Sequence, residues 1–411
     1  MIFIDTTRLH KRKHQNPSGI DRVIIAYQNW LKNSKKPLVE LKYDFYGVSI
    51  DSEPNRSLLQ KVNLATLQIG AKRAALKLKS SSDLYKAKYE ELKSLDLSVN
   101  SNRFQASPKL TQKIENSGQS AYFGIGHDIL LRNSYLEWLS KINGMKKVFF
   151  IHDTIPLDYP EFCREEERGR HKLRIFNAHI HGDLLIVNSQ YTADRLEYWR
   201  NFWSLKEVPI HILHIGVEQC SKEPYEDEST AHPYFVMLGT IEPRKNHLLL
   251  INIWLLMLET MPLDQIPKLL IIGRIGWKVE EVEQTLKTHS ALQKVVELKE
   301  NITDEELWPI IKKSRALLFP SFVEGWGMPL VEALSLQVPA ICSDIPALKE
   351  AGQEMAEYCS PMNGEVWKEK ILEFAHHPEK SRAKQLLRLE KFKAPTWEGH
   401  FKKLEAIIEQ L

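Results

Sequence analysis

The stretch F-P-S-F-V-E-G-W-G-M-P-L-V-E-A-L-S-L-Q-V-P-A-I-C-S-D-I-P-A-L-K-E, residues 319–350, decides the fold. It holds two glutamates, Glu324 and Glu332, with seven residues between them. A Gly-Trp-Gly turn follows the first glutamate, and an apolar segment with helical periodicity leads into the second. We predict a buried strand over 316–319, a tight loop, and a helix that begins near Met328, because the proline that follows suits a first helical turn.

The loop between this strand and this helix has the features of an anion site. Gly325 and Gly327 allow the backbone to approach a ligand closely. Free N–H groups and the positive end of the helix dipole point toward the same place. Glu324 beside such a site accepts hydrogen bonds from hydroxyl groups, so we predict a ligand in which phosphate is joined to polyhydroxyl groups. Taken alone, two glutamates at this spacing are equally typical of a helix face or a loop edge.

The run P-S-F-V-E-G-W-G-M-P-L-V-E-A-L resembles the E-x7-E signature of retaining nucleotide-sugar glycosyltransferases of the GT-B fold, family 4. Further similar stretches lie in the family's order: G-T-I-E-P-R-K-N-H from Gly239, I-T-D-E-E-L from Ile302 and S-D-I-P-A-L-K-E from Ser343. The resemblance implies an α/β protein with two Rossmann-like domains, whose parallel sheets face a cleft. It also implies that a C-terminal helix crosses back to the first domain.

The same resemblance assigns roles in the second half of the chain. It implies that Glu324 holds the sugar hydroxyls and positions the anomeric carbon, that Glu332 binds the ribose, and that Ile302 lies against the nucleotide base. The other donor-binding residues that it implies in this stretch are Gly325, Trp326, Gly327 and Met328.

Two adjacent cations, Arg244 and Lys245, follow the predicted strand 234–238. Arginine offers a planar fork of donors and lysine a compact charge, which together suit a diphosphate. The family more commonly places an arginine directly after the glycine, where this chain has Thr240, so we expect Arg244 to replace it. The alternative is an exposed basic turn without a ligand.

The first half of the chain begins with a strand, a polar loop ending at Gly19, and a helix, which is a Rossmann-like beginning. The resemblance implies that Gly19 lies near the donor phosphate, although a plain turn before a helix has the same pattern. His152 follows the hydrophobic strand 147–151, at the end of a strand where ligands bind in open α/β sheets. In the family, a histidine here lies near the transferred sugar. The pair His127-Asp128 is the rival position.

A chain of 411 residues is long enough for two domains with full cores. We predict an acceptor-binding domain over 1–216, a nucleotide-sugar-binding domain over 217–392 and the returning helix over 393–411, with a polar, acidic linker starting at 217. A lysine-rich helical segment at about 61–95 belongs to the first domain.

Composition and charge narrow the function and the location. A net charge of +3 is too small to indicate nucleic acid as a partner. The four cysteines have no metal-binding spacing, and there is no D-x-D motif to hold a metal, so we predict neither a metal nor another cofactor. The chain lacks a signal-peptide core, and its longest apolar run is shorter than the roughly 20 residues of a membrane span. We predict a cytoplasmic protein whose basic segment either lies on the anionic inner membrane, is solvated, or flanks the acceptor site.

The predicted reaction moves a sugar from a nucleotide diphosphate sugar to a hydroxyl of a glycan or lipid-linked glycan, with retention at the anomeric carbon. G-T-I-E-P-R-K-N and G-W-G-M-P resemble bacterial mannosyltransferases of surface-polysaccharide (O-antigen or capsule) assembly, which implies GDP-mannose as the donor. A UDP-sugar-dependent transferase and a sugar-nucleotide epimerase or phosphorylase are the enzymatic alternatives. A two-lobed sugar-binding protein without activity is the alternative outside enzymes.

Overall fold

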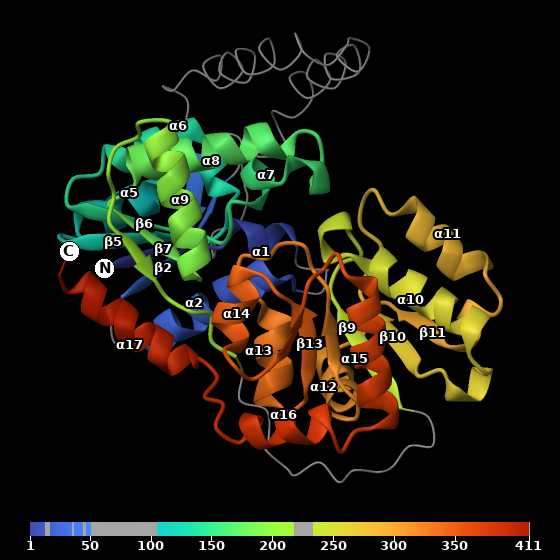
Figure 1. Ribbon diagram of the computed structural model, residues 1–411. Helices are drawn as coiled ribbons and strands as arrows, with labels where there is room; N and C mark the ends of the chain where they lie inside the picture. Colours follow the sequence, from blue (N-terminus) through green and yellow to red (C-terminus); the bar gives the residue numbers. More distant parts are fainter. Residues whose placement is uncertain (13–16, 35–36, 44–46, 51–104, 218–232, 411) are drawn as a thin grey trace, which may run out of the picture. The chain divides into compact units, whose positions relative to one another are not determined.

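The computed structural model describes residues 1–12, 17–34, 37–43, 47–50, 105–217 and 233–410 (Figure 1). The lysine-rich segment predicted at about 61–95 lies outside these residues. Among the described helices, none combines the length and the apolar character that crossing a lipid bilayer requires.

Two sheets form the framework of the described chain. The first has the strand order β4-β3-β2-β1-β5-β6-β7-β8 and the second the order β11-β10-β9-β12-β13-β14. The strands of the first sheet are β1 (Ile2–Asp5), β2 (Leu38–Tyr43), β3 (Gly47–Ile50), β4 (Gln105–Ala106), β5 (Ser120–Gly124), β6 (Met145–Ile151), β7 (Leu184–Val187) and β8 (Ile210–Ile212). Those of the second are β9 (Tyr234–Leu238), β10 (Lys268–Ile272), β11 (Val296–Lys299), β12 (Leu317–Phe319), β13 (Ala340–Ser343) and β14 (Glu357–Cys359).

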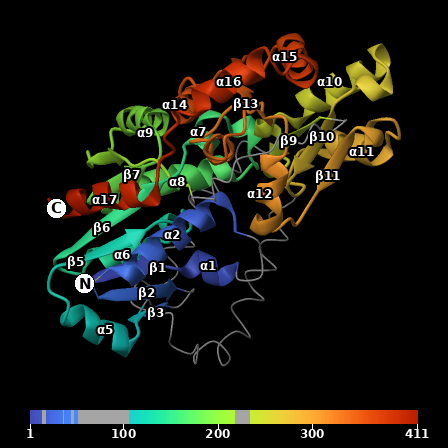
Figure 2. The same ribbon diagram turned by 90° about the horizontal axis from the view of Figure 1, so that it is seen from below.

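Most strand pairs are parallel, as the α/β prediction requires. Strand β1 pairs parallel with β2 on one side and with β5 on the other, whereas β2 and β3 pair antiparallel. In the second sheet, β9 pairs parallel with β10 and β12, and β13 pairs parallel with β12 and β14. Strand β12 is apolar and buried throughout, as is typical of a parallel strand covered on both faces. Figure 2 shows helices on both faces of the second sheet.

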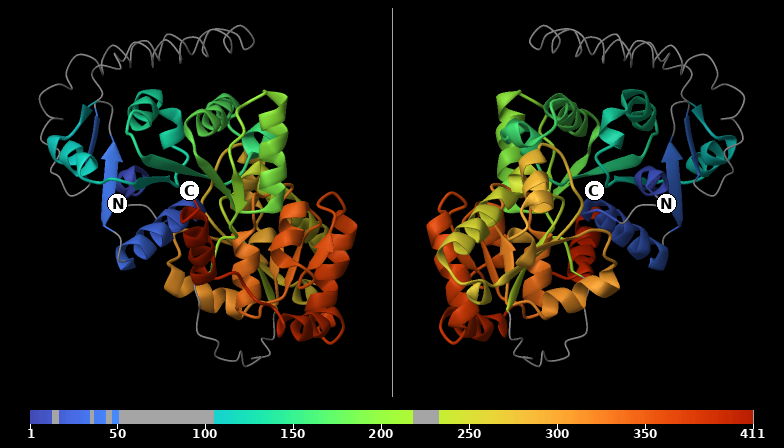
Figure 3. Two further views of the ribbon diagram at one scale, coloured as in Figure 1. Left: turned by 90° about the vertical axis from the view of Figure 1, so that its left-hand side faces the viewer. Right: turned by 90° about the vertical axis from the view of Figure 1, so that its right-hand side faces the viewer.

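The helices follow the strands in the alternating order of a doubly wound fold. In the first part of the chain they are α1 (Thr7–Lys11), α2 (Gly19–Asn33), α5 (Pro108–Glu115), α6 (Asn133–Ser140), α7 (Ile155–Asp158), α8 (Glu167–His181) and α9 (Gln190–Phe202). Those that follow are α10 (His247–Thr260), α11 (Glu280–Thr288), α12 (Asp304–Lys312), α13 (Met328–Ser335), α14 (Pro346–Gly352), α15 (Gly364–His376), α16 (Ser381–Leu389) and α17 (Trp397–Ile408). Figure 3 shows the helices and strands from two further sides.

The described chain forms two compact units. Unit 1 comprises Met1–Phe150, Lys172–Leu185 and Leu205–Pro209, and unit 2 comprises Ile151–His171, Ile186–Ser204 and Ile210–Leu411. The segments that follow β6 and β7 are thus grouped with unit 2, because they pack on its loops. The predicted domain limits at 216 and 392, and the predicted return of the last helix to the first domain, stay predictions.

Candidate functional site

The predicted strand, loop and helix around Glu324 are confirmed. Strand β12 ends at Phe319 and α13 begins at Met328, with Pro329 in its first turn. Gly327 has φ = 135°, a backbone conformation that residues with a side chain rarely adopt. This turn therefore requires glycine at 327 for a reason that the sequence pattern alone did not give.

Gly325 is required by a close backbone contact. A Cβ atom at this position would lie 2.4 Å from the carbonyl oxygen of His152. The carbonyl oxygen of Gly325 accepts hydrogen bonds from Ser189 Oγ at 2.6 Å and Thr192 Oγ1 at 3.2 Å. The loop after β12 is thus held against the loops after β6 and β7, all within unit 2.

Glu324 is the centre of a buried charge cluster. Its Oε2 lies 2.7 Å from Arg244 Nη1, and its Oε1 lies 2.6 Å from Lys245 Nζ. Ser321 Oγ donates a hydrogen bond to Oε1 at 2.8 Å. Glu242 completes the cluster through an ion pair of its Oε1 with Arg244 Nε at 2.6 Å. The structure therefore brings together the three residues that were predicted to share one site, although their roles stay predictions.

The cluster shifts the ionisation of its members. Burial alone raises the pKa of Glu324, but the charges of Arg244 and Lys245 outweigh it and bring the pKa to about 2. Burial raises the pKa of Glu242, since the attraction of the same cations offsets it only in part. Burial lowers the pKa of Lys245, partly against the attraction of Glu324. Two cations and two carboxylates make the cluster neutral, so an anionic ligand has to displace or loosen an existing ion pair.

Sequence reasoning did not assign roles to three members of this neighbourhood, Glu242, Ser321 and Asp153. Glu242 stands two residues before Arg244, and Ser321 three residues before Glu324. Asp153 acts electrostatically on Arg244 and raises its pKa, together with Glu324 and Glu242 and against burial. Glu242 is the acidic residue of the G-T-I-E-P-R-K run, and its place near Arg244 could have indicated an ion pair, because an arginine that folding removes from water needs a carboxylate partner.

His152 lies where the sequence predicted, directly after β6, and is buried. Its carbonyl oxygen accepts a hydrogen bond from Asn188 Nδ2 at 2.8 Å. The next carbonyl, that of Asp153, lies 2.9 Å from His171 Nε2. His152 and Glu324 thus belong to the same unit, and the carbonyl oxygen of His152 lies against Gly325, the residue that follows Glu324.

Trp326 is held by packing. Its ring stacks on His214 with centroids 4.6 Å apart, and only 4% of the residue is exposed. His214 Nε2 lies 3.0 Å from Glu350 Oε1, and Glu350 also accepts hydrogen bonds from the backbone N–H of Gln190 at the start of α9. This network fixes the Gly-Trp-Gly turn, so the predicted contact of Trp326 with the donor stays a prediction.

The remaining predicted donor residues of unit 2 lie on α13 and before α12. Met328 is half-buried at the first position of α13, and Glu332 is buried one turn further along the helix. Ile302 is half-buried and precedes Thr303, which caps α12 in the predicted capping box with Glu306.

Gly19 belongs to unit 1, where it is the first residue of α2. Ser18 caps this helix, and Asp21 completes a capping box with it. The rival pair His127-Asp128 also lies in unit 1, after β5, where Asp128 pairs with Arg8 at 3.4 Å. The structure places Gly19 at the start of a helix, and its predicted contact with the donor phosphate stays a prediction.

Known proteins are similar to this chain in sequence and in fold. Residues 222–385 match the family model "Glycosyl transferases group 1". The serotype-specific mannosyltransferase WbdA of Escherichia coli is 31% identical over 251 residues, which cover 56% of this chain and 30% of WbdA. The O-antigen chain mannosyltransferase RfbU of Salmonella typhimurium is 25% identical over 232 residues, which cover 56% of this chain and 61% of RfbU. This chain therefore matches only part of the length of either relative.

Two solved structures share the fold over the whole chain. Sucrose-phosphate synthase of Thermosynechococcus elongatus superposes with a TM-score of 0.62 at 14% identity, covering 100% of this chain and 98% of that one. The Anabaena protein Alr3699/HepE, solved in complex with UDP, superposes with a TM-score of 0.62 at 12% identity, covering 100% and 99%. Both matches confirm the predicted GT-B architecture. Residues 222–385 therefore carry a group 1 glycosyltransferase domain, which contains both the E-x7-E run and the G-T-I-E-P-R-K-N-H run, and the chain has the GT-B fold.

Proposed function

We propose that the chain is a retaining transferase that moves mannose from GDP-mannose to a hydroxyl group of a glycan acceptor, in the synthesis of a bacterial surface polysaccharide. Support for mannose comes from the similarity to the mannosyltransferases WbdA and RfbU, the second of which acts on O-antigen chains by its name. The acceptor in this proposal is a glycan or a lipid-linked glycan.

The observation that carries the proposal is the buried cluster of Arg244, Lys245 and Glu324 between β9, β12 and the start of α13. Two cations beside the first turn of a helix, Lys245 buried and Arg244 half-buried, are suited to a diphosphate. Glu324 holds both of them in the free protein. In the donor complex, we expect the phosphates to take over the cations, and the carboxylate to turn to the hydroxyl groups of the sugar.

Arg244 and Lys245 then stabilise the charge that develops on the leaving phosphate, without a metal. Removing one such preorganised donor typically costs about 2.7–4 kcal/mol of transition-state stabilisation. Glu332 binds the ribose, and Gly19, Ile302, Gly325, Trp326, Gly327 and Met328 complete the donor contacts. His152 orients the transferred sugar, and the leaving phosphate takes the proton of the attacking hydroxyl.

A transfer assay tests the reaction. The protein is incubated with GDP-mannose and a mannose-terminated oligosaccharide, and free GDP and the lengthened glycan are measured. We expect GDP to be released only when the acceptor is present. Release without any acceptor would favour another reaction, and binding of glycan without consumption of donor would favour the sugar-binding protein.

The donor base is tested by thermal shift with GDP, UDP, CMP and dTDP. We expect GDP to raise the melting temperature most, since ligands that bind the native state stabilise it. A larger shift with UDP would replace GDP-mannose by a UDP-sugar. Activity in the presence of a chelator tests the metal-free proposal, and complete loss of activity restored by magnesium would contradict it.

The cytoplasmic location and the peripheral association with the inner membrane are part of the proposal as well. The lysine-rich segment at about 61–95 would carry the membrane contact. Flotation of the protein with anionic vesicles at low salt tests it, and a protein that stays at the bottom of the gradient does not dock.

A further inference from the structure

Arg12, which follows α1 in unit 1, holds a guanidinium donor that no group in the described chain satisfies. Its Nη2 atom is buried and has no hydrogen-bond partner in the described chain. Its Nε atom forms an ion pair with Asp21 Oδ2 at 3.0 Å. Buried donors are nearly always paired in folded proteins, and leaving them unpaired costs free energy. The side chain as a whole is 22% exposed, although Nη2 itself is covered.

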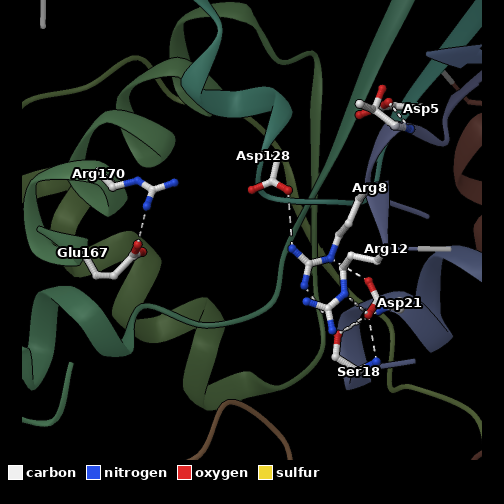
Figure 4. Close-up of polar contacts among 9 residues, drawn as sticks. Asp5, Arg8, Arg12, Ser18, Asp21, Asp128, Glu167 and Arg170 are labelled. Carbon is white, nitrogen blue, oxygen red and sulfur yellow. Dashed lines mark hydrogen bonds and ion pairs between the residues drawn. The ribbon is translucent and has the colours of Figure 1, made fainter. Parts of the chain in front are cut away.

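The neighbouring arginine is satisfied by the protein. Arg8 Nε donates a hydrogen bond to Asp21 Oδ1 at 2.7 Å, and Arg8 Nη1 reaches Asp128 Oδ2 at 3.4 Å. Ser18 donates to Asp21 Oδ2 through its backbone N–H at 2.8 Å and through its hydroxyl at 2.6 Å. Figure 4 shows Arg8 and Arg12 converging on Asp21, with Asp128 on the far side of Arg8. Asp21 thus pairs with Arg8, Arg12 and Ser18, and Arg12 keeps Nη2 as a donor without a partner in the described chain.

The position in the sheet is one where ligands bind. Strand β1 pairs with β2 on one side and with β5 on the other. The next strand in the sequence, β2, therefore extends the sheet on one side of β1, and the later strand β5 extends it on the other side. Arg8 and Arg12 come after the carboxyl end of β1, and Asp128 comes after the carboxyl end of β5. A reversal of strand order opens a crevice outside the carboxyl ends of the strands, and α/β proteins use it as a binding site.

Among the charged residues near the carboxyl end of β1, Arg12 is the cation that is available to a ligand. Lys11 lies over the ring of Tyr43, with Nζ 5.1 Å from the centroid. Burial raises the pKa of Asp5 to about 6, against the hydrogen bonds that it accepts from Thr7, so this carboxylate is partly protonated in mildly acidic conditions. Asp128 is 37% exposed and is partly neutralised by Arg8.

We propose that Arg12 binds a phosphate group carried by the glycan acceptor, while Arg8 holds the neighbouring Asp21 in an ion pair. This inference rests on the proposed function. The residues assigned above to the nucleotide sugar lie in unit 2, apart from Gly19. An anion site in unit 1 is therefore available to bind the second substrate. Arginine is the residue of choice for phosphate, because its planar fork of N–H groups matches two phosphate oxygens.

Isothermal titration calorimetry on the full chain tests the proposal with three probes. Octyl α-mannosyl phosphate carries a phosphodiester, as a lipid-linked acceptor does. Mannose 6-phosphate carries a monoester, as a phosphorylated glycan does, and octyl α-mannoside is the uncharged match. We expect at least one charged probe to bind at least tenfold more tightly than octyl α-mannoside, and the tighter of the two identifies the source of the phosphate.

Three variants separate recognition from structure. Arg12→Gln should reduce the preference for the charged probe to less than twofold, and Arg12→Lys should keep part of it. Lys141→Gln removes an exposed cation before the amino end of β6, whereas Arg12 follows the carboxyl end of β1, and this variant should keep the full preference for the charged probe. Because Arg12 Nε pairs with the buried carboxylate of Asp21, Arg12→Gln should melt somewhat below the wild-type protein, and Arg12→Lys, which keeps the charge, should melt less far below it.

Several results would overturn the proposal. The proposal fails if the wild-type protein binds charged and uncharged probes equally tightly. It also fails if Arg12→Gln keeps the wild-type preference for the charged probe. A lower melting temperature of Arg12→Gln with no change in preference would assign Arg12 a structural role. Inorganic phosphate that binds as tightly as the charged sugars would remove the acceptor from the proposal. Failure of the proposed function is a different result, namely no transfer from any nucleotide sugar, whichever probe binds.

Discussion

Replacing Glu324 by glutamine keeps the shape of the side chain and removes the charge that pairs with Arg244 and Lys245. The side chain is only 9% exposed, so solvent screens these ion pairs weakly. The pKa of Glu324 falls from 4.5 to about 2 on folding, against the effect of burial, because of the two cations. By linkage this difference corresponds to about 3 kcal/mol of stability at neutral pH.

The sign of the pH dependence follows from the direction of the shift. A carboxylate whose pKa is lowered on folding stabilises the protein above its unfolded pKa of 4.5, and the contribution is lost as the pH falls through about 2. At pH 3 about 1 kcal/mol of the contribution remains. The gap in stability between the wild-type protein and Glu324→Gln should therefore be largest near pH 7 and less than half as large near pH 3.

Urea unfolding, followed by tryptophan fluorescence at both pH values, measures this gap. Glu259→Gln, at an exposed position near the end of α10, is the matched control and should cost little at either pH. Transfer of mannose by Glu324→Gln should also fall at least tenfold. A variant as stable as the wild-type protein at pH 7, or a gap that does not shrink at pH 3, would refute the reasoning about the charge cluster.

Three further predictions concern the surroundings of the site. Gly325→Ala places a Cβ atom 2.4 Å from the His152 carbonyl oxygen and should destabilise the protein by about 1–3 kcal/mol in urea unfolding, whereas Gly169→Ala, with no atom within 4 Å, should not. Glu350→Gln weakens the carboxylate that accepts hydrogen bonds at the start of α9, and should cost about 1–2 kcal/mol by the same measurement; no loss would show that the contact is dispensable. Burial, with the charge of Lys245 adding to it, lowers the pKa of His247 to about 3, so the wild-type protein should lose stability as the pH falls from 6.5 toward 3, and a His247→Leu variant that loses just as much would contradict this.

Local patterns in the sequence predicted the elements well, because the residues that decide each element are neighbours in the chain. The helix at Met328 was expected from Pro329 and the apolar spacing behind it, and its start is confirmed. The cap at Thr303 is likewise a local feature, since the glutamate that completes it stands three residues later and the reciprocal hydrogen bonds are present. The buried strand before the glycine turn and the GT-B architecture were also predicted correctly.

The partners of the site residues were not readable from the sequence, because they come from segments far apart in the chain. Nothing in the run around Gly325 indicates that His152, from a segment 173 positions earlier, lies against it. The stacking of Trp326 on His214, and the contact of His214 with Glu350, likewise depend on how three segments pack.

The sequence by itself determined that this protein has alternating strands and helices, a glycine turn before a helix, and two cations and a glutamate suited to a sugar phosphate. The tertiary structure decided that these cations are already neutralised by Glu324 and Glu242, since only packing brings the two loops within ion-pair distance. It also decided that Arg12 keeps an unsatisfied donor while Arg8 does not. The physical reason is the same in both cases, because the charge that a buried group meets depends on its neighbours in space and not on its neighbours in the chain.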